Sequence, residues 1–149
     1  MHLDCAANQT SEVPEQESIP ERETCKTPKT GAKLRVLVAD DHTVFRKSLI
    51  QLLKEIPELE VIADAQDGQQ AVELTVLLRP DVVIMDVEMP RMNGIEATRK
   101  IKSIFPHVRI IGVSMHPYGE VESRIIAAGA VQYFPKGDPV EELLSAIQC

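Results

Sequence analysis

From residue 34 onwards, the chain alternates between short apolar segments and longer amphipathic ones. The short segments are rich in Val, Ile and Leu without a polar face, which is typical of buried strands. They lie at residues 34–39, 59–65, 81–85, 108–114 and 131–134. The longer segments carry apolar side chains at helical spacing and predict helices over residues 43–56, 68–79, 93–105, 118–129 and 138–148.

Local sequence signals mark the ends of the predicted helices. Thr43 is the expected N-cap of the first helix, and Pro80 ends the second, because the residue before a proline disfavours helix. Gly129 is the expected C-cap of the fourth, and Asp138 with Pro139 opens the last. One face of the first helix is expected to carry its apolar residues, which are Val44, Phe45, Leu49, Leu52, Leu53 and Ile56.

Strands that are apolar on both faces and separated by helices predict a parallel sheet with helices on both sides. Right-handed crossovers then give a doubly wound α/β fold with five strands in the flavodoxin-like order 2-1-3-4-5 and five helices. Residues 1–32 differ, because they are rich in Glu, Thr, Ser and Pro and lack apolar periodicity. They predict a disordered tail or linker ahead of one domain at residues 33–149.

Composition narrows the possible environments of the chain. The net charge is -7, which argues against a general nucleic-acid or membrane surface. No stretch reaches the roughly 18 apolar residues that span a bilayer, and the first ten residues lack signal-peptide features. Cys5, Cys25 and Cys149 have no metal-binding spacing, so they predict a reducing cytoplasm with idle thiols, or an intermolecular disulfide through the tail.

Polar residues lie at or just after the ends of four of the five predicted strands. Asp40 and Asp41 follow the first, Asp86 the third, and Lys136 the fifth, while Ser114 ends the fourth. Parallel strands place their carboxyl ends at one edge, where ligands bind in such folds. Taken singly, such an acid is commonly a loop residue or helix cap and such a lysine is solvated, but those explanations do not account for all five positions together.

Three carboxylates in one pocket repel one another by roughly 4 kcal/mol per pair at an intermediate dielectric, and a divalent cation removes that repulsion. Oxygen ligands with open positions suit Mg²⁺. Lys136 adds a positive charge and Ser114 a hydrogen bond, which together are suited to holding a phosphoryl group. Asp86 lies centrally and is the expected acceptor of that group, because a carboxylate can form an aspartyl phosphate.

The segments "VLVADDH", "DVVIMDVEMPRMNGIEA", "IIGVSMH" and "AAGAVQYFPK" resemble the receiver domain of two-component response regulators over residues 34–147. "DDHTVFRKSL" and "PKGDPVEELLSAI" resemble receivers of the NarL-like group, and equally the C-terminal receiver of hybrid sensor histidine kinases. The resemblance implies phosphorylation of the chain by a histidine kinase or a histidine phosphotransfer domain.

The resemblance also implies a role for each matching residue. Asp86 would be the phosphoacceptor, and Asp41, Asp86 and the backbone carbonyl of Glu88 would bind Mg²⁺, with Asp40 acting through water. Ser114 would be the switch hydroxyl, Lys136 would bind a phosphoryl oxygen, and Tyr133 would be the switch aromatic. The face from about Tyr118 to Ile147 would carry the signal to a partner or a dimer mate.

Two positions depart from the family pattern. Receivers often have a proline directly after the lysine across a cis bond, but here Pro135 precedes Lys136 and Gly137 follows it, so that bond is not carried over. The position after the switch hydroxyl is often small, but here it is Met115, followed by His116. We expect Glu88, Met115 and His116 to set the lifetime of the phosphorylated state.

Three other functions fit parts of the pattern. Haloacid-dehalogenase-like phosphatases also use an aspartyl phosphate, but their motif follows the first strand, and here "DVEMP" follows the third. A degenerate receiver that only binds partners is disfavoured, because every chemical position is filled. A DNA-binding regulator would need a helix-turn-helix, and none follows the last predicted helix, so we expect no DNA binding by this chain. A phosphoacceptor domain without further enzymatic activity fits best.

Overall fold

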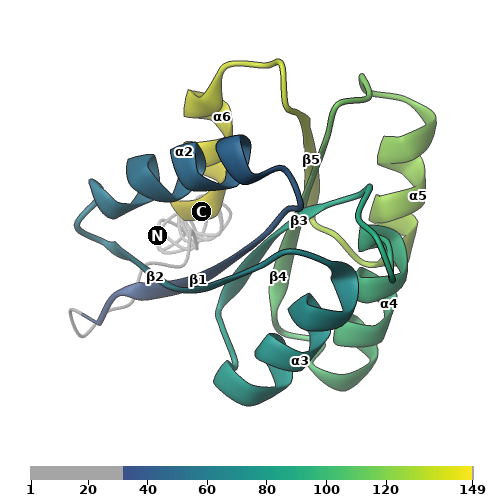
Figure 1. Ribbon diagram of the computed structural model, residues 1–149, viewed down its shortest axis with the longest axis horizontal. Helices are drawn as coiled ribbons and strands as arrows, with labels where there is room; N and C mark the ends of the chain where they lie inside the picture. The colour runs from purple at the N-terminus through teal and green to yellow at the C-terminus, as the bar shows by residue number, and fades with distance from the viewer. Residues whose placement is uncertain (1–31, 149) are drawn as a thin grey trace, which may run out of the picture.

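The computed structural model describes residues 32–148 and contains one parallel sheet of five strands in the order β2-β1-β3-β4-β5 (Figure 1). The strands are β1 (Leu34–Ala39), β2 (Leu59–Ala65), β3 (Val82–Asp86), β4 (Arg109–Ser114) and β5 (Gln132–Pro135). The helices are α2 (Thr43–Lys54), α3 (Gly68–Leu78), α4 (Gly94–Ile104), α5 (Glu120–Ala128) and α6 (Val140–Gln148). This architecture confirms the predicted fold class and strand order.

The tail predicted over residues 1–32 lies almost entirely outside the described residues, as do Cys5, Cys25 and Cys149. Within residues 32–148, no helix combines the length and apolar character that crossing a membrane requires. The same part of the chain contains no cis peptide bond.

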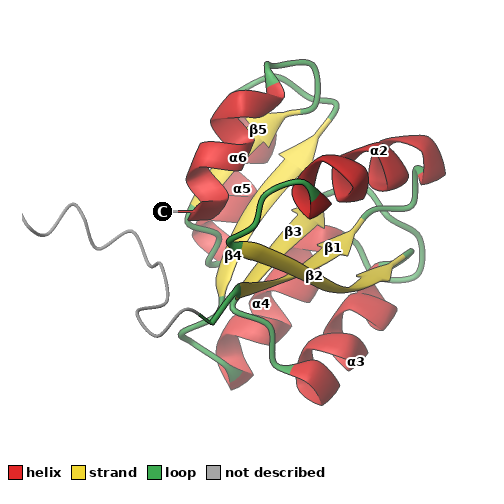
Figure 2. Cartoon of the chain, turned by 90° about the vertical axis from the view of Figure 1, so that its left-hand side faces the viewer, coloured by secondary structure: helices red, strands yellow, loops and turns green. Residues whose placement is uncertain are grey.

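Helices cover both faces of the sheet, in the arrangement that right-handed crossovers produce. On one face, Leu49 and Leu53 of α2 and Leu143 and Ile147 of α6 pack against the sheet residues of one buried cluster. On the other face, α3, α4 and α5 pack against a second buried cluster. Figure 2 shows α2 and α3 on opposite sides of β1 and β2. The core is almost wholly aliphatic, as the low aromatic content predicts.

The strand register brings the predicted site residues to one edge of the sheet. Ala39 pairs with Met85, so Asp40 and Asp86 come next to each other on adjacent strands. Ser114 pairs with Pro135, which places Lys136 just beyond the end of β4. β3 includes Asp86 as its last residue, one position further than the predicted strand. The acid therefore belongs to the sheet itself.

The start of α2 corrects two predictions. Its N-cap is His42, not Thr43, and the His42 side chain makes no capping hydrogen bond. Val44 is 80% exposed and Leu52 37%, so both are wrong as members of the buried face. Arg46, Leu49 and Leu53 form the buried stripe instead, at helical positions i, i+3 and i+7. Val44 points elsewhere because it lies about 200° around the helix from Arg46.

The other helix ends differ little from the predictions. Gly129 is the C-cap of α5, with φ of 126°, which confirms that assignment. Before Pro80, α3 ends on Arg79 in the left-handed conformation, with φ of 53°. The last helix begins at Val140, one residue after Pro139.

Gly94, the first residue of α4, lies against the backbone of Asp86. A Cβ atom at Gly94 would come within 2.0 Å of the Asp86 carbonyl oxygen, so any side chain there must displace the end of β3. We predict that Gly94→Ala lowers the free energy of unfolding by about 2 kcal/mol or more, measured by urea denaturation followed by circular dichroism.

Gly137→Ala is the matched control for this substitution. No atom lies within 4 Å of a Cβ built at Gly137, so we expect a change within about 0.5 kcal/mol. Equal losses in the two variants would contradict the close approach of α4 to Asp86.

Candidate functional site

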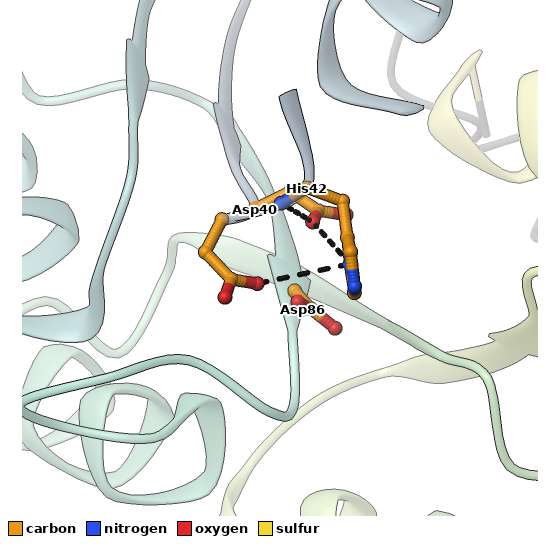
Figure 3. Close-up of side chains that lie close together, drawn as sticks. Asp40, His42 and Asp86 are labelled. Carbon is orange, nitrogen blue, oxygen red and sulfur yellow. Dashed lines mark hydrogen bonds and ion pairs between the residues drawn. The ribbon is translucent and has the colours of Figure 1, made fainter. Parts of the chain in front are cut away.

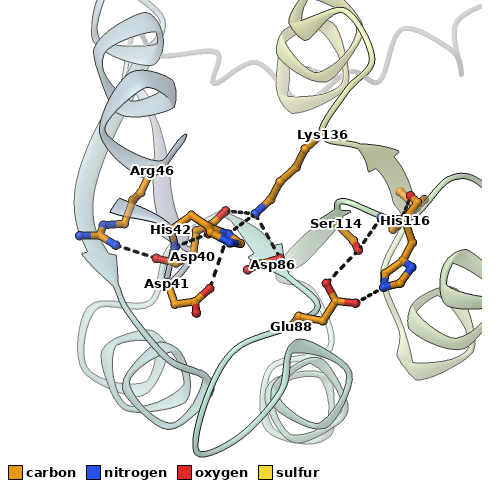
Figure 4. Close-up of polar contacts among 10 residues, drawn as sticks. Asp40, Asp41, His42, Arg46, Asp86, Glu88, Ser114, His116 and Lys136 are labelled. Carbon is orange, nitrogen blue, oxygen red and sulfur yellow. Dashed lines mark hydrogen bonds and ion pairs between the residues drawn. The ribbon is translucent and has the colours of Figure 1, made fainter. Parts of the chain in front are cut away.

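Four of the predicted site residues meet at the carboxyl edge of the sheet. Asp40, Asp86 and Ser114 are buried at the ends of β1, β3 and β4, and the Lys136 side chain enters from the end of β5 with 4% of its surface exposed. Asp41 lies at the rim, with its side chain 35% exposed. Figure 4 shows that all five residues surround one site, as predicted.

Lys136 is the counter-charge of the two buried acids. Its Nζ lies 2.8 Å from Asp40 Oδ2 and 3.4 Å from Asp86 Oδ1. The same ammonium lies 3.1 Å from His42 Nδ1 and 4.7 Å from the centre of the Phe45 ring. His42 and Phe45 both belong to the start of α2, so this helix contributes to the position of the lysine.

Asp86 holds its proton unusually strongly. Burial, and next the neighbouring Asp40 carboxylate, raise the pKa of Asp86 from 3.8 to about 8, while Lys136 opposes the rise. Among the described residues, Asp86 Oδ2 is buried without a hydrogen-bond partner, and Asp40 Oδ2 makes no aligned hydrogen bond despite its contact with Lys136. Such atoms are costly unless a cation or a donor reaches them.

The acids at this edge fit a divalent cation. One ligand atom from each of Asp40, Asp41, His42 and Asp86 lies within 4.8 Å of all the others. Carboxylate oxygens are the ligands that hard divalent cations prefer. A cation held by these residues would neutralise the repulsion that helps to raise the Asp86 pKa. The side chain of Glu88 is not part of this cluster.

Glu88 instead joins two loops beside the site. Its Oε2 lies 2.5 Å from His116 Nε2, and its Oε1 lies 3.4 Å from Ser114 Oγ (Figure 4). The backbone N–H of His116 donates to Ser114 Oγ at 3.1 Å, and the Tyr133 hydroxyl donates to the His116 carbonyl oxygen. The predicted residues Glu88, Ser114, His116 and Tyr133 therefore form one network. Met115 lies between them in sequence but is 67% exposed.

Sequence reasoning missed two residues of the site. Arg46 is buried, donates from its guanidinium to the Asp40 carbonyl oxygen at 2.7 Å, and pairs with Asp64 at 2.8 Å. Arg46 lies three residues before Leu49, on the same face of the helix, and this spacing was the signal in the sequence that could have found it. His42 also contacts the acids, and its place directly after Asp40 and Asp41 was the signal for it.

Comparison with known proteins places this arrangement in one family. The family model described as the response regulator receiver domain matches residues 36–148. The transcriptional regulatory protein DegU of Brevibacillus brevis is 36% identical over 78% of this chain and 49% of its own length. A protein-glutamate methylesterase/protein-glutamine glutaminase of Pyrococcus abyssi is 46% identical over 73% of this chain and 30% of its own length.

A solved structure agrees with these matches. The crystal structure of a two-component response regulator of the LuxR family from Aurantimonas sp. SI85-9A1 aligns with a TM-score of 0.75 and 33% identity, over 78% of this chain and 84% of that one. The chain spans about half of DegU and less of the methylesterase.

The raised pKa of Asp86 predicts a pH-dependent cost to stability. Between its unfolded pKa of 3.8 and its folded value of about 8, the folded chain binds a proton that the unfolded chain has released. Stability therefore falls as the pH rises through this window. Asp86→Asn removes the cost, so we expect it to raise the melting temperature by roughly 5 °C more at pH 8 than at pH 4.5, without divalent ions.

Thermal melts followed by circular dichroism would measure this difference. Glu60→Gln, at an exposed position of β2, is the control and should shift equally at both values of pH. A pH-independent shift for Asp86→Asn would contradict the strained state of the buried acid pair.

Proposed function

The chain belongs to the response regulator receiver domain family of two-component signalling systems, and from this we propose that Asp86 accepts a phosphoryl group from a histidine kinase or a histidine phosphotransfer domain. The observation that carries the proposal is the buried, unpartnered Oδ2 of Asp86, next to Lys136 at the carboxyl edge of the sheet. A nucleophilic oxygen in that position faces a site that already gathers the charges a phosphoryl group needs.

The transfer is a displacement at phosphorus. A carboxylate oxygen of Asp86 attacks the phosphorus of a phosphohistidine, the P–N bond breaks, and its electron pair leaves with the imidazole nitrogen, which takes up a proton. Lys136, already 3.4 Å from Asp86 Oδ1, moves onto a phosphoryl oxygen. Catalysis here is mainly positioning and charge neutralisation. We propose that the domain catalyses only its own phosphorylation and dephosphorylation.

Mg²⁺ is the proposed cofactor. Asp41, Asp86 and the backbone carbonyl of Glu88 would hold it directly, and Asp40 would act through water. When bound, the ion supplies positive charge that neutralises the phosphoryl oxygens. The support for it is the donor set of the cluster and the unpartnered oxygen of Asp86.

Ser114 and Tyr133 are the proposed switch pair. Ser114 Oγ is shared between Glu88 and the His116 N–H, and we propose that it moves to the phosphoryl oxygen after transfer. Tyr133 is buried, contacts the Tyr118 ring edge-on, and donates to the His116 carbonyl. A shift of the β4–α5 loop with Ser114 would therefore change the packing of Tyr133, which lies on the face from about Tyr118 to Ile147 proposed to contact a partner or a second copy.

The proteins that resemble this chain favour the response regulator reading over a receiver of a hybrid kinase. DegU is named a transcriptional regulatory protein, and the Aurantimonas protein a response regulator. We propose a cytoplasmic location and no DNA binding by residues 33–149 themselves. A phosphatase of the haloacid-dehalogenase type is disfavoured, because the Glu88 side chain turns to Ser114 and His116 rather than to the acids.

Phosphorylation at Asp86 is testable with a small donor. With acetyl phosphate and Mg²⁺, wild type should gain the mass of one phosphoryl group, while Asp86→Asn should gain none. Asp81→Asn, at the opposite end of the segment that contains β3, is the control and should be modified like wild type. Intact-protein mass spectrometry, with EDTA samples in parallel, measures the result.

Absence of Mg²⁺-dependent modification in wild type, or equal modification of Asp86→Asn, would contradict the proposed acceptor. Multiple-turnover hydrolysis of p-nitrophenyl phosphate by wild type would favour the phosphatase instead.

We expect the pair formed by Glu88 and His116 to set the lifetime of the phosphorylated state. Because the pair lies beside the site and contacts Ser114 through Glu88, removing either side chain should admit water to the acyl phosphate. We expect Glu88→Ala and His116→Ala to speed dephosphorylation by about threefold or more without abolishing phosphorylation. Met115→Ala should have a smaller effect in the same direction, because this side chain is largely exposed.

Decay of the phosphorylated mass after removal of acetyl phosphate gives these rates. His107→Ala is the control, since His107 lies against Phe105 beyond the end of α4. Rates in all three variants equal to wild type would show that these side chains do not set the lifetime.

A further inference from the structure

His42 turns its imidazole toward the acids, although it is the N-cap residue of α2. Its ring makes no capping hydrogen bond, and Nδ1 lies 3.3 Å from Asp40 Oδ1 and 3.7 Å from Asp41 Oδ1. Figure 3 shows the ring beside the carboxylates of Asp40 and Asp86. The backbone N–H of His42 donates to Asp40 Oδ1 at 2.8 Å, so the residue is fixed close to the acid cluster.

The cluster has the size of a single-ion site. The candidate ligand atoms of Asp40, Asp41, His42 and Asp86 lie within 4.8 Å of one another, while ligands on opposite sides of an ion at about 2.1 Å lie roughly 4.2 Å apart. A small contraction closes that difference. The buried Asp86 Oδ2, which has no hydrogen-bond partner among the described residues, is an independent observation that fits a cation bound by this cluster. Three carboxylates and the Lys136 ammonium also leave two negative charges for a divalent ion when all are ionised.

We propose that His42 Nδ1 is a direct ligand of the ion in this site, and that the site therefore binds first-row transition ions such as Mn²⁺ in preference to Mg²⁺. This inference rests on the proposed function, because it concerns the ion that supports phosphorylation of Asp86. Mg²⁺ is bound almost entirely by oxygen, whereas transition ions accept imidazole nitrogen readily. A histidine among the ligands therefore stabilises bound transition ions but not bound Mg²⁺.

Ligation by His42 has a consequence for Lys136. The Nδ1 atom now lies 3.1 Å from Lys136 Nζ, and its single lone pair serves either the ammonium or a metal ion, but not both. Metal binding therefore releases Lys136 from His42 and leaves it with Asp40 and Asp86. The lysine can then bind a phosphoryl oxygen at Asp86. The His42 imidazole would therefore couple metal binding to the position of Lys136.

Electron spin-echo envelope modulation of bound Mn²⁺ tests the ligand directly, since it detects a coordinated ¹⁴N nucleus. The samples are the full chain, freed of metal and loaded with Mn²⁺, as wild type, His42→Gln and His116→Gln. We expect nitrogen modulation in wild type and His116→Gln and its loss in His42→Gln. His116 is the matched control, because it is a second exposed histidine near the site that pairs with Glu88 instead.

Affinity supplies the second readout. By titration of the free Mn²⁺ signal, His42→Gln should weaken Mn²⁺ binding by about tenfold, while its affinity for Mg²⁺, measured by competition, should change by less than about twofold. Circular dichroism verifies that the variant is folded.

Two results would overturn the inference: no nitrogen modulation in wild type, or modulation that persists in His42→Gln. If either occurs while acetyl phosphate and Mg²⁺ still modify Asp86, the proposed function stands and only the role of His42 fails. If neither ion binds and Asp86 is not modified, both proposals fail together.

Discussion

The close approach of two buried carboxylates, Asp40 and Asp86, is the constraint on which this site depends. The register of β1 and β3 forces them together, and burial with the Asp40 charge raises the pKa of Asp86 to about 8. Lys136 is the cation that contacts both acids within the described chain, and it leaves an oxygen of Asp86 unpartnered. The fold imposes repulsion between the two carboxylates, and an added cation would relieve it. The site therefore favours binding of a cation.

The repulsion persists because the surrounding structure fixes the backbone at this edge. Arg46 lies buried beneath the loop after β1 and donates to the Asp40 carbonyl oxygen, while Asp64 at the end of β2 holds its guanidinium. Gly94 lets α4 begin directly against the Asp86 carbonyl. Neither acid relaxes away from the other without breaking the hydrogen bond from the buried Arg46 or displacing a helix, and both changes are costly.

The sequence predicted the strands, their order and the acids, because a two-sided apolar strand can only lie inside a sheet and its end defines an edge. It did not reveal which face of α2 is buried. Val44 was expected on the apolar face of the helix and Arg46 was not, yet Val44 is exposed and Arg46 is buried. Its burial depends on Asp64, eighteen positions further along the chain, and on a backbone carbonyl. Such contacts leave no periodic pattern in the sequence. The contact of the His42 imidazole with the acids leaves none either.

His116 connects the chemistry of the site to the surface beyond it. Its side chain pairs with Glu88, its N–H binds Ser114, and its carbonyl accepts from Tyr133. If a phosphoryl group on Asp86 draws Ser114 away, as proposed, one of these three contacts is lost and negative charge is added near Glu88. A ligand shifts a two-state protein only as far as it interacts differently with the two states. Because one residue joins all three contacts, the proposed movement of Ser114 would also change the support of Tyr133 and would connect a charge at Asp86 to β5.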